Sequence, residues 1–158
     1  VAYDEDLLVG YRHFDAMDEQ PLFPFGHGLS YTSFAFDGLR VRCRRGGRAE
    51  AIVRVANVGS RAGTAVVQLY LGFPTAAGEP PNQLKGFART PLRVGERHRI
   101  RMPIAAASFA VWDTASAGWR VQAGVYAIRI ATSSRDLLLE GAVTMGSVAS
   151  GRGACRLH

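Results

Sequence analysis

Residues 50–71 read EAIVRVANVGSRAGTAVVQLYL, and this stretch decides the fold class of the chain. Over residues 50–55, apolar residues alternate with a mixed set, which is typical of a strand that turns one face to a core. Residues 57–63 carry the asparagine and the glycines of a turn. The alternation then resumes over residues 66–71. The stretch therefore predicts two short strands separated by a turn.

The same alternation recurs toward the C-terminus, with turn residues between the repeats. Further strands are expected within residues 84–92, 99–104, 109–112, 119–121, 126–130 and 137–143. About seven or eight strands at such intervals, with almost no helical periodicity, are typical of a β-sandwich. Each strand has one apolar face and one mixed face, so two sheets must pack face to face. The predicted fold class is all-β, an immunoglobulin-like β-sandwich.

The first 33 residues lack this alternation. Residues 7–11, LLVGY, form a continuous apolar run, which predicts a short strand buried on both faces. Residues 21–32, PLFPFGHGLSYT, hold prolines that stiffen the chain and glycines that let it turn. We interpret this second run as an extended apolar linker that is packed along a surface.

Length and composition are those of one globular domain. The chain has 158 residues, of which 47% are hydrophobic and 20% charged. No stretch approaches the roughly 18 consecutive apolar residues that span a membrane, so no membrane partner is expected. The chain begins with Val1 and not with methionine, and its first residues look like the middle of a domain. We therefore expect a fragment of a longer protein, and the cellular compartment stays open.

The net charge of +6 is unevenly distributed. Residues 1–20 contain six acids and one arginine, a balance of −5, so the remainder carries +11. Arginines such as Arg54, Arg99, Arg101 and Arg129 alternate with apolar residues, as on the solvent faces of strands. A basic chain can bind nucleic acid, but no recognition motif accompanies the charge. No nucleic-acid partner is expected.

The two cysteines, Cys43 and Cys155, lie far apart in the sequence. No Cys-x-x-Cys motif or Cys/His cluster is present, so no zinc site is expected. Two cysteines alone do not decide the redox compartment. The segment from Gly146 onward is small and polar, with too little apolar surface to order itself. We expect residues 146–158 to form a disordered tail.

Several short motifs, taken in order, resemble the C-terminal region of family 3 glycoside hydrolases, to which β-glucosidases belong. They are VGYR at 9–12, the linker at 21–32, Asn57-x-Gly59, VVQLY at 66–70, LKGF at 84–87, Trp112-Asp113, Trp119, Gly124-x-Tyr126 and SSRD at 133–136. The resemblance extends over most of the chain. It implies that the sandwich is a fibronectin type III-like domain, preceded by a short strand and the linker.

The resemblance also implies a domain division and a function. Residues 1–20 would end the family's α/β sandwich domain, 21–33 would be the linker, and 34–145 the fibronectin type III-like domain. The parent enzyme would hydrolyse terminal β-linked glycosyl residues with a pair of carboxyl groups. The family places both carboxyl groups in earlier domains, which would be the partners of this chain. We expect the chain to stabilise and orient those domains and to be inactive alone.

No catalytic, cofactor-binding or metal-binding residue is predicted. The clustered acids Glu5, Asp6, Asp15, Asp18 and Glu19 are interpreted as a solvated rim, because charged residues are mostly exposed. Residues with a possible role in sugar or domain contacts are His27, Lys85, Trp112 and Trp119.

Each of these four residues also has a structural interpretation. His27 sits between two glycines of the linker, where a hydrogen-bonding role is favoured over general-base catalysis. The tryptophans offer flat apolar faces to a sugar, although packing is the commoner role. Lys85 precedes Phe87, which is expected in the core. The long loop 73–82 is a further candidate, since long loops are often functional.

The alternative to a domain of a larger enzyme is an independent carbohydrate- or protein-binding β-sandwich module. Such a module would use Trp112, Trp119 or the loop 73–82. It would bind sugar as a well-behaved monomer. The sequence leaves sugar specificity and oligomeric state open.

Overall fold

The computed structural model describes residues 6–146 and 155–157. Its helical elements are α1 (Tyr11–Met17) and two 3-10 turns, η1 (Thr75–Ala77) and η2 (Ala106–Phe109). The strands are β1 (Phe34–Arg44), β2 (Arg48–Asn57), β3 (Gly63–Gly72), β4 (Gln83–Leu92), β5 (Arg97–Ile104), β6 (Ala110–Asp113), β7 (Gly118–Val121), β8 (Gly124–Ala131), β9 (Leu137–Met145) and β10 (Cys155–Leu157).

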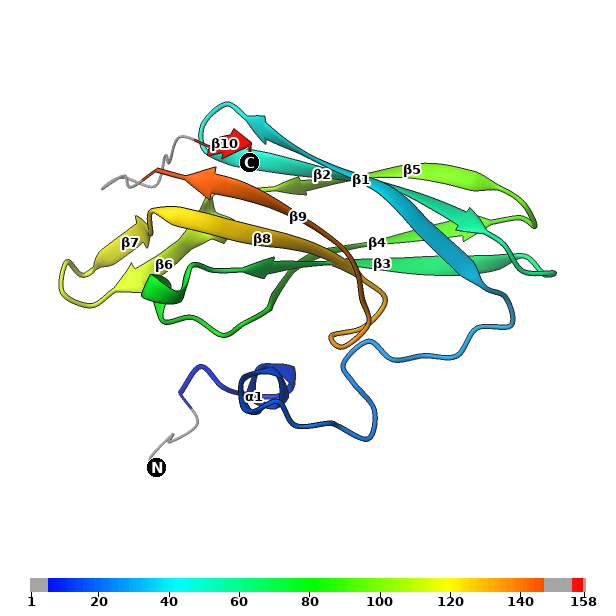
Figure 1. Ribbon diagram of the computed structural model, residues 1–158, viewed down its shortest axis with the longest axis horizontal. Coiled ribbons are helices and arrows are strands. Elements are labelled where there is room, and N and C mark those ends of the chain that lie inside the picture. The colour runs from blue at the N-terminus through cyan, green and yellow to red at the C-terminus, as the bar shows by residue number, and fades with distance from the viewer. Residues whose placement is uncertain (1–5, 147–154, 158) are drawn as a thin grey trace.

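The strands form two facing antiparallel sheets and a separate hairpin (Figure 1). One sheet has the order β1-β2-β5, and the other has the order β10-β9-β8-β3-β4. Strands β6 and β7 pair only with each other among the described residues and project at one end. The predicted all-β sandwich is confirmed.

The core lies between the two sheets and follows from the alternation in the sequence. Val53 and Val55 of β2 face Val67 and Leu69 of β3, and all four side chains are buried. Ile128 of β8, whose side chain points into the same core, is buried with them. Branched side chains suit this packing because they fill a pleated surface with little loss of rotamer freedom.

Tyr126 of β8 ties the sheet to the segment that leads into the β6–β7 hairpin. Its ring lies edge-on to Phe109, with 5.3 Å between the ring centroids. Its buried hydroxyl lies 2.9 Å from the carbonyl oxygen of Gln122 and 3.2 Å from that of Phe109, so it donates to this pair. Burial raises the pKa of Tyr126 to about 12. A tyrosine hydroxyl bonded to the backbone a few residues upstream also stabilises immunoglobulin-type sandwiches.

Replacing Tyr126 with phenylalanine is expected to lower the free energy of unfolding by about 1–2 kcal/mol. The ring packing stays, but the buried carbonyl group of Phe109 and the partly buried carbonyl group of Gln122 lose their shared donor. Urea denaturation measures the change. Tyr31→Phe is the matched control, because Tyr31 is exposed and its hydroxyl has no hydrogen bond among the described residues. Equal stability of both variants would contradict the prediction.

The predicted strand at residues 7–11 is wrong. Residues 6 and 7 form a turn, and α1 begins at Tyr11 directly after Gly10, whose φ is +58°. A strand needs a neighbour to satisfy its backbone groups, and none of the described residues pairs with this segment. The apolar run instead leads into a helix of seven residues, too short to be stable without contacts to the sheet.

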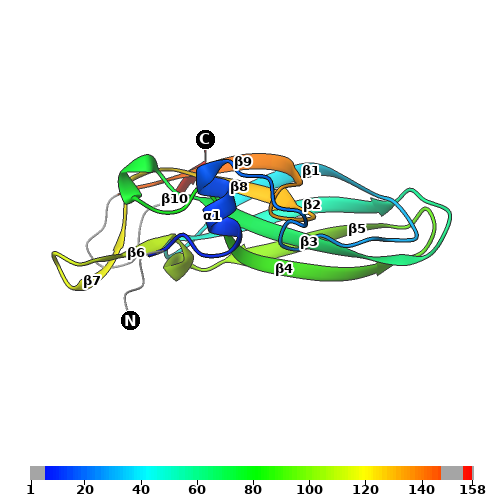
Figure 2. The ribbon, with the colours of Figure 1, turned by 90° about the horizontal axis from the view of Figure 1, so that it is seen from below.

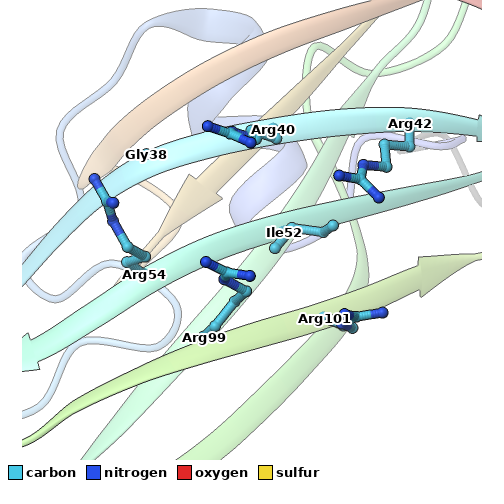
Figure 3. Close-up of a pocket in the computed structure, with 7 residues that line it drawn as sticks. All are labelled: Gly38, Arg40, Arg42, Ile52, Arg54, Arg99 and Arg101. Carbon is cyan, nitrogen blue, oxygen red and sulfur yellow. The ribbon is translucent and has the colours of Figure 1, made fainter.

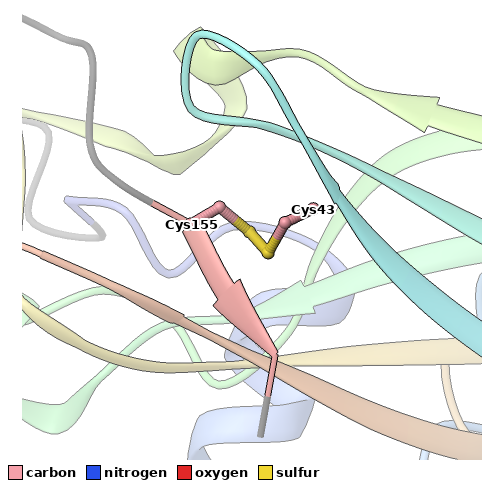
Figure 4. Close-up of a disulfide and its surroundings, with 2 residues drawn as sticks. All are labelled: Cys43 and Cys155. Carbon is pink, nitrogen blue, oxygen red and sulfur yellow. A yellow bond between two sulfur atoms is a disulfide. The ribbon is translucent and has the colours of Figure 1, made fainter.

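The predicted disorder of the C-terminal segment is also wrong where the structure describes it. Residues 155–157 form β10, in which Cys155 pairs with Met145 of β9. Cys155 forms a disulfide with Cys43 of β1, and the two Cα atoms lie 5.5 Å apart (Figure 4). The segment has too little apolar surface to pack against the sandwich by itself, and the disulfide holds it there instead. The rest of the predicted tail, apart from Gly146, lies outside the described residues.

Candidate functional site

The N-terminal part of the chain lies against the outer face of the five-stranded sheet, on the side away from the core (Figures 1 and 2). We call residues 11–26, which comprise α1 and the first half of the linker, the docked segment. Its contacts reach β3, the start of β4 and the β8–β9 turn.

An aromatic contact anchors α1. The ring of Tyr11 lies edge-on to Tyr70 of β3, with 5.8 Å between centroids, and 5.5 Å from Phe25. The hydroxyl of Tyr11 accepts a hydrogen bond from the backbone N–H of Leu84 at 2.9 Å. Tyr70 points away from the core, yet it is completely buried because the docked segment covers it. Burial, with Tyr11 and Asp15 nearby, raises the pKa of Tyr70 far above its usual value.

A short hydrogen-bond chain continues from Tyr70 across the sheet. The hydroxyl of Tyr70 donates to Gln68 Oε1 at 2.6 Å, and Gln68 Nε2 donates to the carbonyl oxygen of Thr132 at 2.8 Å. Gly26 lies directly over Gln68, where an added Cβ would come within 2.1 Å of Nε2. The φ of Gly26 is +83°, a backbone conformation that favours glycine, and a Cβ there would also displace the hydrogen-bonded amide of Gln68.

An ionic cluster holds the other end of α1. The Asp15 side chain is only 2% exposed, and its carboxylate accepts from Asn82 Nδ2 and from Arg135 Nη1, each at 3.3 Å. Arg135 Nη2 also donates to the carbonyl oxygen of Glu19 at 3.1 Å. Arg129 donates to Asn82 Oδ1 at 2.7 Å, which turns the amide nitrogen of Asn82 toward Asp15. A buried carboxylate is costly unless it is paired and hydrogen-bonded, so burial of Asp15 depends on both Arg135 and Asn82.

The second half of the linker is attached at Thr32. Its hydroxyl donates to Asn57 Oδ1 at 2.7 Å, and the N–H of Val58 donates to the carbonyl oxygen of Ser33 at 2.9 Å. An added Cβ at Gly59 would come within 2.3 Å of Thr32 Oγ1. The Asn57-x-Gly59 motif therefore makes a turn and also binds the end of the linker at Thr32.

Between these attachment points, the linker presents large apolar side chains to solvent. We call Leu22, Phe23, Leu29 and Tyr31 the outer linker face. Leu29 is 97% exposed and Tyr31 is 91% exposed, and the other two are also exposed. A group of exposed apolar side chains on a segment that is itself fixed by hydrogen bonds marks an interaction surface.

His27 and Lys85 lie at different places around the docked segment. The backbone N–H of His27 donates to the carbonyl oxygen of Pro24 at 2.9 Å, while its exposed ring lies 5.5 Å from that of Phe23. Lys85 is half-buried, with Nζ 5.3 Å from the centre of the Phe73 ring. Burial lowers the pKa of Lys85.

Trp112 and Trp119 face each other across the β6–β7 hairpin and are both exposed. Their rings are 5.6 Å apart and perpendicular, an arrangement that stabilises the hairpin. Beside them, the hydroxyl of Ser116 and the guanidinium of Arg120 lower the pKa of Asp113 to about 2. No contact among the described residues joins the tryptophans to His27 or Lys85, so the four candidates do not form one site.

Two further expectations need correction. Asp15 does not belong to a solvated rim, unlike the exposed Asp6, Asp18 and Glu19, because Arg135 and Asn82 bury it. Glu5 lies outside the described residues. Phe87 is not in the core but 67% exposed, because it is paired with Gln68 and shares the outer face of the sheet.

Within the described residues, no group of three or more His, Cys, Asp or Glu side chains is placed to hold a metal ion. No helix in the same part of the chain is long and apolar enough to cross a membrane. The loop 73–82 contains η1 and ends at the buried Asn82, which contacts Asp15. The loop therefore supports the docked segment.

The family model for the fibronectin type III-like domain matches residues 65–134. Probable beta-glucosidase D of Aspergillus niger is 36% identical over 90% of this chain and 22% of its own length. Thermostable beta-glucosidase B of Acetivibrio thermocellus is 38% identical over 93% of this chain and 20% of its own length. This chain corresponds to the C-terminal, fibronectin type III-like part of family 3 β-glucosidases.

Solved structures agree with this assignment of the fibronectin type III-like domain. The GH3 beta-glucosidase of Bifidobacterium adolescentis matches 90% of this chain with a TM-score of 0.87 and 35% identity. Beta-glucosidase 3B of Thermotoga neapolitana, in complex with glucose, matches 99% of this chain with a TM-score of 0.83 and 34% identity. The chain covers 21% of each of these two proteins, about a fifth of their length.

Proposed function

We propose that this chain is the C-terminal part of a β-glucosidase-like glycoside hydrolase and that it stabilises and orients the catalytic domains. The reaction of the whole enzyme would be hydrolysis of terminal β-linked glycosyl residues. The names of the relatives that match about nine-tenths of the chain support this proposal. So does the small share of those relatives that the chain covers.

The observation that carries the structural role is the outer linker face. Its large apolar side chains are exposed, while the backbone that holds them is bonded to Ser134 in the turn after β8 and to Val58 in the turn after β2. A partner domain that covers these side chains would gain apolar burial at little cost in ordering, because the linker is already fixed. We propose that residues 21–33 form this linker, between the end of an α/β domain at 1–20 and the sandwich at 34–145.

The docked segment would make the junction rigid. Because α1 is held by Tyr70 at one end and Arg135 at the other, any domain attached before it would have a fixed orientation to the sandwich. His27, exposed beside Phe23, and Lys85, close to Tyr11 through the neighbouring Leu84, would contact such a domain. Neither residue is proposed to act in catalysis.

A chimaera tests this proposal. The complete chain replaces the segment that it matches in the Bifidobacterium adolescentis enzyme, and β-glucoside hydrolysis and thermal stability are measured. We expect an active chimaera, whereas the double variant Phe23→Asp/Leu29→Asp should lose about tenfold in activity after mild heating. The control variant Val94→Asp changes an exposed apolar residue outside the linker and should behave like the parent chimaera.

Two outcomes would count against the proposal. One is hydrolysis of the β-glucoside by this chain alone. The other is an equal effect of the linker variant and the Val94→Asp control, because then the outer linker face would contact no partner domain.

The exposed tryptophan pair favours a second candidate function, an independent carbohydrate-binding module. In that case the isolated chain would bind β-glucan oligosaccharides, and Trp112→Ala/Trp119→Ala would abolish the binding. Calorimetric titration of the isolated chain distinguishes the two functions. The domain role predicts no measurable heat of binding, either for the isolated chain or for its Trp112→Ala/Trp119→Ala variant.

A further inference from the structure

The outer face of the β1-β2-β5 sheet is strongly basic. Five arginines line a shallow hollow of about 90 Å³. Figure 3 shows how their side chains lie on the strands. We call Arg40, Arg42, Arg54, Arg99 and Arg101 the basic face. It is on the side of the sandwich opposite to the docked segment (Figure 1), so it stays free when that segment is covered.

The pairing of the strands brings like charges together on this face. Arg54 of β2 is directly opposite Arg99 of β5, and Ile52 is paired with Arg40 on one side and Arg101 on the other. Like charges at directly opposed positions of a sheet are destabilising. The sheet therefore carries a repulsion that a bound anion would relieve.

Few carboxylates within the protein offset this charge. Arg54 forms an ion pair with Asp37. Among the described residues, no Asp or Glu forms an ion pair with Arg40, Arg42, Arg99 or Arg101. Glu50, which pairs with Arg44, is also the cross-strand neighbour of Arg42. Arg40, Arg99 and Arg101 are therefore the guanidinium groups most available to an external anion.

The arginines are arranged in rows with a regular spacing. Arg40 and Arg42 on β1, and Arg99 and Arg101 on β5, are two residues apart, which places successive side chains about 6.8 Å apart along a strand. The two rows flank β2, about 10 Å from each other. Such rows suit a linear polymer that bears a negative charge on successive units. A single small anion would use only part of them.

We propose that the basic face binds an acidic polysaccharide, a polymer of uronic acid units. The planar fork of arginine bonds a carboxylate through two parallel hydrogen bonds, so carboxylates on successive sugar units can each engage one arginine. Disulfides such as Cys43–Cys155 persist in oxidising settings such as the extracellular space, and this favours an extracellular polymer over nucleic acid as the ligand. The central Ile52 is buried, so the face has no apolar side chain to insert into a membrane.

The test measures binding of the complete chain to polygalacturonate by affinity electrophoresis, at low salt and at about 0.15 M salt. The triple variant Arg40→Gln/Arg99→Gln/Arg101→Gln removes three charges from the basic face. It should lower the affinity about tenfold, as expected for three partly exposed ion pairs. The control triple variant Arg61→Gln/Arg89→Gln/Arg93→Gln removes the same charge from exposed positions elsewhere and should lower it less than about twofold.

Competing ligands decide what kind of anion the face binds. Neutral β-glucan should not bind. Tighter binding of duplex DNA or of vesicles with anionic phospholipid than of polygalacturonate would overturn the proposal, as would equal losses in the two triple variants. None of these measurements depends on glycosidase activity, so their outcome is independent of the proposed function.

Discussion

Replacing both Cys43 and Cys155 with serine is expected to lower the free energy of unfolding by about 4–5 kcal/mol. The disulfide joins residues that are 112 positions apart, so it closes a loop that includes most of the sandwich. In the unfolded chain, such a bond removes much of the conformational freedom that folding must otherwise overcome. Urea denaturation followed by the fluorescence of Trp112 and Trp119 measures the difference.

Reducing agent provides the control for this experiment. It should lower the stability of the parent chain to that of the Cys43→Ser/Cys155→Ser variant and leave the variant itself unchanged. A parent chain whose denaturation midpoint does not respond to reduction would show that the bond contributes nothing to stability.

Replacing Arg135 with methionine is expected to release the docked segment, at a cost of about 3–5 kcal/mol in the free energy of docking. Methionine keeps much of the packing of the arginine stem but leaves Asp15 buried without its cation. Hydrogen exchange measures the result at two amides that report docking. These are Leu84, which donates to Tyr11, and Ser134, which donates to the carbonyl oxygen of Phe25.

Arg54→Met is the matched control, because Arg54 pairs with Asp37 where both side chains are more than half exposed. It should change the free energy of unfolding by less than about 1 kcal/mol and leave the Leu84 and Ser134 amides protected. If Arg135→Met also left both amides protected, Asp15 would not hold the segment.

The sandwich could be predicted because its signal is local. In β2, β5 and β8 the side chains that alternate in the sequence are the ones that alternate between core and solvent. Each such strand has a period of two residues, and this period alone fixes which face is buried. No knowledge of distant residues was needed for these strands.

The docked segment could not be predicted because its contacts join residues far apart in the sequence. Gln68 and Tyr70 occupy the solvent-facing positions of β3, yet both are buried under residues more than 40 positions earlier. Asp15 looks like one more acid in an acidic stretch until Arg135, 120 positions later, is placed beside it. The alternation of apolar and polar residues predicts which face of the sheet a side chain is on. It does not predict whether another segment of the chain covers that face.

The linker was easier to interpret than α1. Its prolines and glycines require an irregular backbone whatever surrounds them, so the irregular course of residues 21–33 follows from its composition. The expected packing of its apolar side chains along a surface does not follow, because Leu22, Phe23, Leu29 and Tyr31 are exposed. The run at 7–11 has no such requirement. Its leucines and valine suit several backbone conformations. Because no strand among the described residues pairs with the run, residues 7–10 form turns and irregular backbone, and only Tyr11 belongs to α1.

Strand β10 has a consequence for how copies of this protein behave toward one another. It lies at the edge of the five-stranded sheet and pairs with the last three residues of β9. Strand β10 covers the last three of the nine residues of β9 and, being three residues long, offers little backbone of its own for another chain to pair with. Without the disulfide, β10 would detach and leave the apolar end of β9 uncovered, an open edge of the kind that starts aggregation. The bond between Cys43 and Cys155 thus protects solubility as well as the fold of each molecule.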